Sequence, residues 1–183
     1  MIDYLRGDSF LYPLGFESGV TGTPAAWLLA FLLATGCIAF TMKNFPRVGQ
    51  TWREISFLKG LSLWAAVGAA VVEEAFFRRI VMDGVMQAGG IVPLQIIASA
   101  LVFGVAHALW GLIKGSVHVA LTAAVATGII GAALAVVYAL GDRSLAPCIA
   151  AHFLIDAVVQ PGLVLSAVSG EWARTAAVGK NAV

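Results

Sequence analysis

Six ionisable side chains lie inside long apolar stretches of this 183-residue chain. A charged group in an apolar span is costly, so such groups usually face a partner or line a functional cavity. Carboxylates and imidazoles in a dry pocket are the groups that general acid–base catalysis uses. The set therefore indicates catalytic chemistry, and its members are Glu73, Glu74, Arg78, His107, His152 and Asp156.

The two adjacent acids differ in their partners along a helix. Glu74 and Arg78 are four residues apart, so they meet on one helix face as an ion pair. Glu73 points about 100° away from Glu74 and has no such partner along the helix. We therefore predict Glu73 as a general base and Glu74 with Arg78 as a supporting pair.

Each of two histidines has a residue of interest four positions away. Phe103 precedes His107, and Asp156 follows His152, at this spacing. Residues four apart share a helix face, so Asp156 is placed to orient the imidazole of His152.

The depths of three of these residues can be compared from the turns. Glu73 precedes Gly90 by the same number of positions by which His107 follows it, which predicts the same level in an antiparallel helix pair. His152 follows a turn at Gly141 closely and is expected nearer the outer surface by about 10 Å. Helix overhang or tilt would have to close that gap.

The elements that carry these residues follow from composition. The chain is 60% hydrophobic and 11% charged, whereas soluble domains carry roughly 25% charged residues. A soluble fold of this size is therefore excluded. The net charge of +1 gives no basic surface for nucleic acid.

Charge-free runs predict the membrane spans. Residues 18–42, 84–113, 115–141 and 144–170 are each long enough for the roughly 20 apolar helical residues that a bilayer requires, with a fifth helix at about 57–85. No run shows strand alternation, and lipid admits only helices or closed barrels. We predict an all-α, polytopic bundle of about five spans, forming a single membrane domain over residues 1–183. Residues 2–16 are expected to lie along the interface, and residues 1–12 do not resemble a signal peptide.

Glycine and proline mark the expected turns at residues 44–50, 89–93, 111–115 and 141–144. Gly128 and Gly131, among many alanines, predict close packing for the fourth span. His118 is interpreted as a helix–helix hydrogen-bonding residue. The remaining charges near helix ends are interpreted as interfacial: Arg79, Asp83, Asp142 and Arg143.

Basic residues predict the orientation. The loop after the first span is rich in them, whereas the N-terminal segment has Arg6 against three acids. We predict an integral multi-pass protein of the bacterial cytoplasmic membrane, with the N-terminus outside and the C-terminus inside. The residues that place the inner side are Lys43, Arg47, Arg53, Lys59, Lys114, Arg174 and Lys180.

Three short patterns together carry a resemblance to a known family. They are EEAFFR at residues 73–78, FGVAH at 103–107 and HFLID at 152–156, which match EExxxR, FxxxH and HxxxN/D. In this order, each on an apolar helix, they resemble the CPBP family of intramembrane proteases. That family includes the CAAX prenyl endopeptidase (the Ras-converting enzyme) and bacteriocin-processing relatives. The resemblance covers roughly residues 60–160, the expected catalytic core.

The resemblance implies catalytic roles. Glu73 would activate the attacking water, and His107 would help to hold it. His152 and Asp156 would stabilise the oxyanion of the tetrahedral intermediate.

The resemblance also implies supporting roles for Glu74, Arg78 and Phe103, and the chain departs from the family pattern at two positions. Asp156 stands where many members have asparagine; an ionised aspartate would repel an oxyanion, so it must be protonated or must orient His152. Arg79 stands where glycine commonly follows, outside the catalytic set.

Two mechanisms and several substrates stay open. Glu73, His107 and His152 could bind Zn²⁺ with an open fourth position, but the tightly spaced HExxH pattern is missing, so we favour a glutamate-activated water without metal or other cofactor. The expected substrate is a membrane-anchored or lipid-modified protein. The small size fits a compact bacterial sorting-type protease that removes C-terminal membrane anchors.

Two functions of other classes also use such a scaffold. One is a non-catalytic immunity or binding protein, although such a protein has no need of the buried polar set. The other is a small proton-coupled transporter, which inverted repeats would favour. The sequence shows no such repeat.

Overall fold

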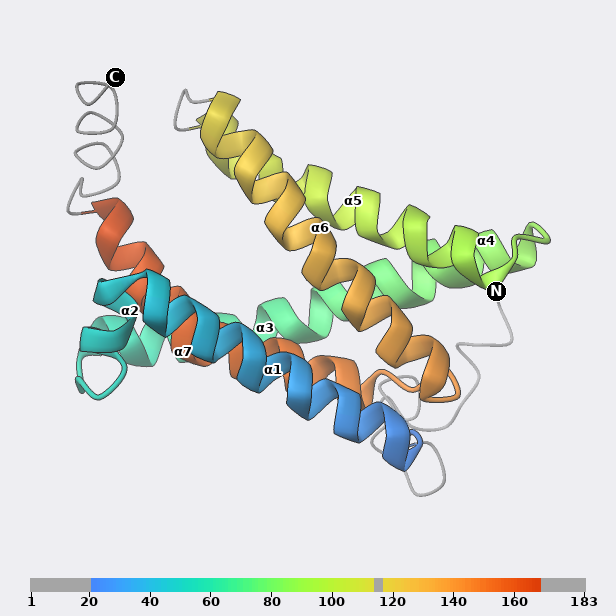
Figure 1. The fold of residues 1–183 in the computed structure, drawn as a ribbon, viewed down its shortest axis with the longest axis horizontal. Helices are drawn as coiled ribbons and strands as arrows, with labels where there is room; N and C mark the ends of the chain where they lie inside the picture. Colours follow the sequence, from blue (N-terminus) through green and yellow to red (C-terminus); the bar gives the residue numbers. More distant parts are fainter. Residues whose placement is uncertain (1–20, 114–116, 169–183) are drawn as a thin grey trace. The chain divides into compact units, whose positions relative to one another are not determined.

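The computed structural model describes residues 21–113 and 117–168, and these form helices with no strand among them (Figure 1). Apolar runs in lipid must satisfy their backbone groups internally, which helices do. The all-α prediction is confirmed. The elements are α1 (Pro24–Asn44), α2 (Pro46–Thr51), α3 (Phe57–Glu74), η2 (Ala75–Met82), α4 (Asp83–Gln87), α5 (Val92–Ile113), α6 (Val117–Leu140) and α7 (Ala146–Val168).

Five helical stretches of the described part are long and apolar enough to cross a membrane. They are Pro24–Asn44, Lys59–Gln87, Val92–Leu109, Val117–Leu140 and Ala146–Leu163. The chain is thus a polytopic membrane protein, as predicted. The suggested interfacial segment at residues 2–16 lies outside the described residues, and so do three of the basic residues used for orientation. The orientation stays a prediction.

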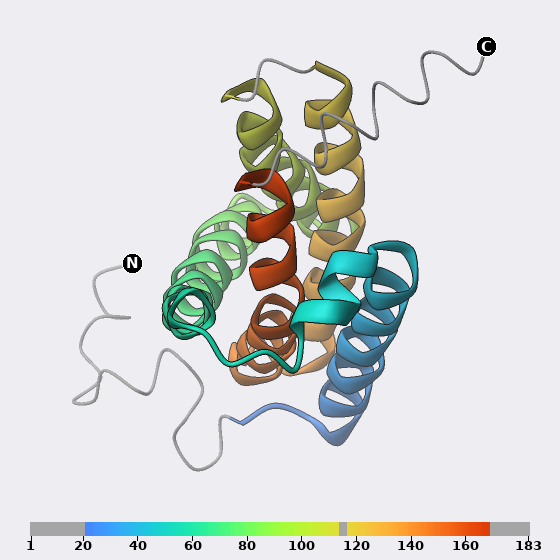
Figure 2. The ribbon, with the colours of Figure 1, turned by 90° about the vertical axis from the view of Figure 1, so that its left-hand side faces the viewer.

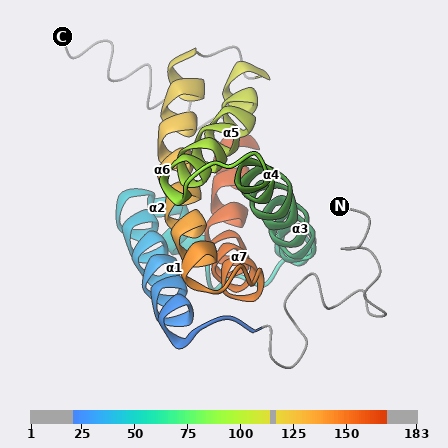
Figure 3. The same ribbon diagram turned by 90° about the vertical axis from the view of Figure 1, so that its right-hand side faces the viewer.

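The second span is one helix with an unusual middle. The α-helix α3 continues into the π-helix η2 and then into α4 without a break (Figure 3). The backbone N–H of Asp83 bonds to the carbonyl of Arg78, five residues back. A π turn holds one more residue than an α turn, so it shifts which side chains share a face; such segments are frequent at functional sites.

The chain divides into two compact units. The first comprises Met1–Phe31 and Val71–Ala150, and the second comprises Leu32–Ala70 and Ala151–Val183. Helices α1, α3 and α7 each contribute to both. The single domain over residues 1–183 and the core over residues 60–160 stay predictions.

In the first unit, α5 packs against α6, and η2 and α4 pack against α5. Small residues allow the closest approach. A Cβ atom on Gly104 would lie 2.5 Å from the backbone oxygen of Ala124, and one on Gly131 would lie 3.1 Å from Phe103. Gly128 also faces Gly104, so the close packing predicted for this span is confirmed.

In the second unit, the expected turn at residues 44–50 is instead mostly the short helix α2, which turns away from the end of α1 (Figure 2). Proline suits the first helical turn because its missing N–H has no partner to lose there, and Pro46 occupies that place. Val48 of α2 packs against Gly162 of α7, where a Cβ would lie 2.7 Å from the Val48 backbone.

The other described turns lie where predicted. Gly89, with a φ of 84°, follows α4. The turn between α6 and α7 contains Asp142 and Arg143, with φ of 53° and 61°. Left-handed backbone at two successive non-glycine residues is unfavourable, so other contacts must hold this turn. Of the turn expected at residues 111–115, residues 111–113 are instead the last residues of α5, which ends at Ile113, and residues 114 and 115 lie outside the described part.

Candidate active site

Glu73 and His107 meet within the first unit. Glu73 stands in the last turn of α3 and His107 two-thirds of the way along α5, and Glu73 Oε2 lies 3.8 Å from His107 Nε2. The equal spacing of the two residues about Gly90 predicted this meeting. Their side chains are 32% and 26% exposed, and the exposed part of Glu73 does not include Oε2, the oxygen that faces His107, which is buried.

The backbone sets the protonation of the histidine ring. His107 Nδ1 lies 2.9 Å from the carbonyl oxygen of Phe103, and a carbonyl only accepts, so Nδ1 carries a hydrogen. In the neutral imidazole the other nitrogen, Nε2, is then an acceptor. In that neutral form, Nε2 and the Glu73 carboxylate are two acceptors that face each other, and this arrangement suits a donor of two hydrogens, such as water.

Glu74 is held very differently. Arg78 Nε donates to Glu74 Oε2 at 2.7 Å, and both side chains are fully buried. A second bond, from Arg78 Nη2 to Glu74 Oε1, measures 3.3 Å. The predicted ion pair is confirmed, and it lies at the junction of α3 and η2.

Phe103 links the ion pair to the histidine. Its ring stacks on His107 with centroids 4.4 Å apart and meets Phe77 edge-on at 4.7 Å. The guanidinium of Arg78 lies 5.8 Å from the Phe103 ring centre. The ring is 3% exposed and fits because Gly131 leaves room for it. Phe103 thus packs directly on the imidazole, and its supporting role stays a prediction.

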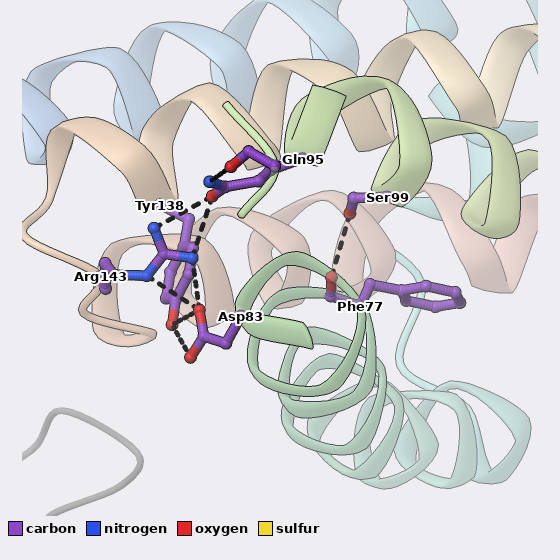
Figure 4. Close-up of polar contacts among 7 residues, drawn as sticks. Phe77, Asp83, Gln95, Ser99, Tyr138 and Arg143 are labelled. Carbon is purple, nitrogen blue, oxygen red and sulfur yellow. Dashed lines mark hydrogen bonds and ion pairs between the residues drawn. The ribbon is translucent and has the colours of Figure 1, made fainter. Parts of the chain in front are cut away.

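Ser99 is a member of this cluster that the sequence analysis missed. It accepts a hydrogen bond from Arg78 Nη1. It donates one to the carbonyl oxygen of Phe77 at 3.1 Å (Figure 4). The signal was present, because Ser99 precedes Phe103 by four residues and so shares its face of α5. Ser99 ties the π segment to α5.

Asp83 and Arg143, which the sequence analysis interpreted as interfacial charges, form an ion pair within the protein. Arg143 Nη2 lies 2.5 Å from Asp83 Oδ1, and Asp83 is 6% exposed (Figure 4). The Tyr138 hydroxyl, 3.2 Å from both Asp83 oxygens, and the Gln95 amide complete the cluster. The two charges belong to distant segments of the chain, so helix periodicity could not pair them.

The second unit holds the other predicted pair. His152 Nε2 lies 3.5 Å from Asp156 Oδ2, one turn apart on α7. Their side chains are 7% and 24% exposed. The expected orientation of the imidazole by the aspartate has this geometric basis. Because the two pairs belong to separately described units, a joint site of four residues stays a prediction.

The first unit supplies two ligands that a zinc ion accepts. A catalytic zinc site uses three protein ligands. Glu73 and His107 would be two of them, and no third His, Cys, Asp or Glu of the described residues in this unit joins them. The ligand set in this unit is therefore incomplete for zinc.

Comparison with known proteins gives one match. The family model "Type II CAAX prenyl endopeptidase Rce1-like" matches residues 56–158, which contain all seven residues predicted for the site. No curated protein and no solved structure matches the chain. The matched segment exceeds half of the chain and carries its three motifs in order. The chain belongs to the Rce1-like family of type II CAAX prenyl endopeptidases.

Proposed function

We propose that this chain hydrolyses a peptide bond of a membrane-anchored or lipid-modified protein, using a water molecule activated by Glu73. The family supplies the general activity, an intramembrane endopeptidase of the CAAX type. The observation that carries the assignment of the base is the pair of facing acceptors, Glu73 and His107.

The first step follows from the hydrogen positions. A water placed between the two groups donates one hydrogen to the Glu73 carboxylate and the other to His107 Nε2, which directs an oxygen lone pair outward. Attack on the peptide carbonyl carbon passes a proton to Glu73 and leaves the negative charge on the carbonyl oxygen. Glu73 then returns the proton to the leaving nitrogen as the carbon–nitrogen bond breaks.

His152 and Asp156 serve the oxyanion in this proposal. His152 would donate a hydrogen bond to the negative oxygen, and donors aimed at developing charge in a dry site contribute strongly to catalysis. Asp156 would orient the imidazole instead of touching the oxyanion, since two negative groups repel. The 3.5 Å contact between them supports this role.

We assign no metal to this mechanism. A zinc ion on Glu73, His107 and His152 is the alternative, and it would act as a Lewis acid on the carbonyl. Zinc retained in equal amount after purification, with activity lost on chelation and restored by zinc alone, would establish that alternative.

The substrate side follows from the setting of the site. Glu73 and His107 lie on membrane spans, so the substrate peptide must be presented within the bilayer. The proposal extends to a sorting-type protease of the bacterial cytoplasmic membrane that acts on C-terminal anchors. The N-terminus would lie outside and the C-terminus inside.

Glu73→Gln tests the proposal. The amide keeps the shape but does not take up a proton, so cleavage of a co-expressed membrane-anchored reporter should fall about 10²–10⁴-fold at equal membrane levels. Glu54→Gln, in an exposed loop, is the matched control and should cleave normally. Full activity in Glu73→Gln would remove Glu73 from the mechanism. Absence of cleavage by the unaltered chain, with reporter binding intact, would favour a non-catalytic binding protein.

A further inference from the structure

The polar cluster around Asp83 and Arg143 lies at the far end of the π segment from Glu73. We propose that Asp83 and Arg143 are a positioning pair, which fixes the register of η2 on α5 and thereby the spacing of Glu73 and His107. This inference rests on the proposed function of Glu73 and names further residues on which that function depends.

The geometry shows one guanidinium joining several helices. Arg143 Nε and Nη2 lie 2.8 and 2.5 Å from Asp83 Oδ1, and Nη1 and Nη2 both lie 3.1 Å from Gln95 Oε1. Gln95 in turn donates to the Gly90 carbonyl at 2.8 Å. Tyr138 of α6 contributes its hydroxyl to Asp83 and its ring to Arg143, whose Cζ is 5.2 Å from the ring centre. Figure 4 shows these contacts converging.

A single stripe on α5 connects this cluster to the catalytic pair. Gln95, Ser99, Phe103 and His107 follow one another at four-residue intervals, so they share one face of the helix. Gln95, Ser99 and Phe103 are each no more than 3% exposed. Each of these four residues contacts either the second span or Arg143. The stripe therefore determines how the second span is positioned along α5.

Which side chains of the second span face α5 depends on the π segment. Arg78 is four residues after Glu74, but Asp83 is five after Arg78, and the bond from Asp83 N–H to the Arg78 carbonyl spans those five residues. The extra residue turns Asp83 toward the cluster where an uninterrupted α-helix would present Met82. On α5, Ser99 accepts a hydrogen bond from Arg78, within the π segment. Gln95 accepts hydrogen bonds from Arg143, which is bonded to Asp83 just after that segment. A loss at the Asp83 end allows η2 to relax toward α-helix, which displaces Glu73 relative to His107.

The turn that carries Arg143 supports a dedicated role. Asp142 and Arg143 both adopt left-handed backbone, which ordinary side chains avoid. The contacts that hold Arg143 there include the bonds of its guanidinium to Asp83 and Gln95 and the bond of its backbone N–H to the Tyr138 carbonyl at 3.1 Å. Asp142 is exposed and has the same charge as Asp83, so it provides a matched control.

The test measures register directly as well as rate. Spin labels at positions 80 and 97, exposed on η2 and α5, would report the distance between the helices in proteoliposomes. The background would carry Cys37→Ser and Cys148→Ala, which remove both native thiols. The variants are Asp83→Asn, Arg143→Gln, the double variant and Asp142→Asn, each also assayed without labels on the anchored reporter.

Asp83→Asn and Arg143→Gln should each shift or broaden the label distance and lower kcat at least tenfold with KM nearly unchanged. The double variant, which leaves no unpaired charge, should recover part of the lost rate. Asp142→Asn should match the parent in both measurements. A fall in thermal stability with unchanged label distance and unchanged kcat per folded molecule would overturn the inference, because a purely structural pair behaves in that way.

Two further measurements separate a failure of the positioning role from misfolding and from a failure of the proposed role of Glu73. If the charge variants do not fold, Tyr138→Phe decides, because it removes one hydroxyl only; an unchanged distance and kcat there would overturn the positioning role. The label distance is read without substrate, so a shifted distance supports the register role even if Glu73→Gln proves fully active. In that case the proposed base fails while the positioning of the two helices stands.

Discussion

Two neighbouring glutamates of this chain occupy opposite environments. Glu74 is fully buried and bonded to Arg78 at 2.7 Å, whereas Glu73 is 32% exposed and lies 3.8 Å from His107 Nε2. One residue of helix rotation therefore separates the carboxylate of the ion pair from the carboxylate that we propose as the general base. An ion pair on one face of a helix can thus hold the backbone that presents a second acid on another face.

The largest difference between the two acids is expected in stability, when the ion pair of Glu74 with Arg78 is removed. Glu74→Gln leaves the buried guanidinium of Arg78 without its countercharge, and breaking such a pair costs about 3–5 kcal/mol. Glu73→Gln should change the free energy of unfolding by only about 0.5 kcal/mol, since its side chain is partly exposed. Equilibrium unfolding in mixed micelles measures both. Equal losses in the two variants would refute the division of roles.

The reactive side of the contrast can be tested at the histidine. His107→Phe removes the acceptor at Nε2 that we propose to orient the water, and cleavage of the anchored reporter should fall about 10²-fold. His118→Phe is the control, because His118 is exposed near the start of α6. An unchanged rate in the His107 variant would place the attacking water elsewhere.

Ser99 tests whether the structural role of Glu74 and Arg78 extends to α5. Ser99→Ala leaves Arg78 Nη1 without its acceptor and the Phe77 carbonyl without its donor. A buried group left unsatisfied costs about 1–3 kcal/mol, which the same unfolding assay resolves. Thr122→Ala, on an exposed face of α6, should cost far less. Equal losses in the free energy of unfolding for the two variants would show that Ser99 does not support the Glu74–Arg78 pair.

The smallest effect is expected in the second unit. Asp156→Asn keeps a side-chain oxygen for His152 Nε2 but removes the charge, a difference of about 1 kcal/mol or roughly fivefold in rate. Steady-state cleavage by both forms checks this, with Asp156→Ala as the variant that loses the contact altogether. A loss in Asp156→Asn as large as in Asp156→Ala would mean that the carboxylate itself takes part in the chemistry.

Local periodicity accounts for what the sequence predicted of the site. The contacts of Glu74 with Arg78 and of His152 with Asp156 are four-residue contacts within one helix, and spacing alone fixes them. Glu73 and His107 lie on different helices, yet their equal separation in sequence from the turn at Gly90 was enough to predict that they lie at the same level. The five spans followed from runs without charge, because lipid leaves the backbone few alternatives.

Contacts between distant segments account for what was missed. The π segment was not predicted, and the contacts beside it, of Arg78 with Ser99 and of Asp83 with Arg143, join segments that are far apart in the sequence. Charges near the ends of apolar runs usually lie at the interface, so a buried pair from two distant segments looks identical in sequence to two solvated charges. The helix α2 was taken for a turn because Pro46 marks both.

The contact between α5 and α6 limits how a peptide reaches Glu73 and His107. Gly104 and Gly128 bring the two backbones so close that one added methyl group would lie 2.5 Å from the Ala124 oxygen. No chain can slide through such a seam without prising the helices apart, and His107 lies less than one turn beyond it. Under the proposed function, a substrate that arrives sideways through lipid would pass along a different flank of α5, and the α5–α6 hairpin would be the fixed wall against which it is held.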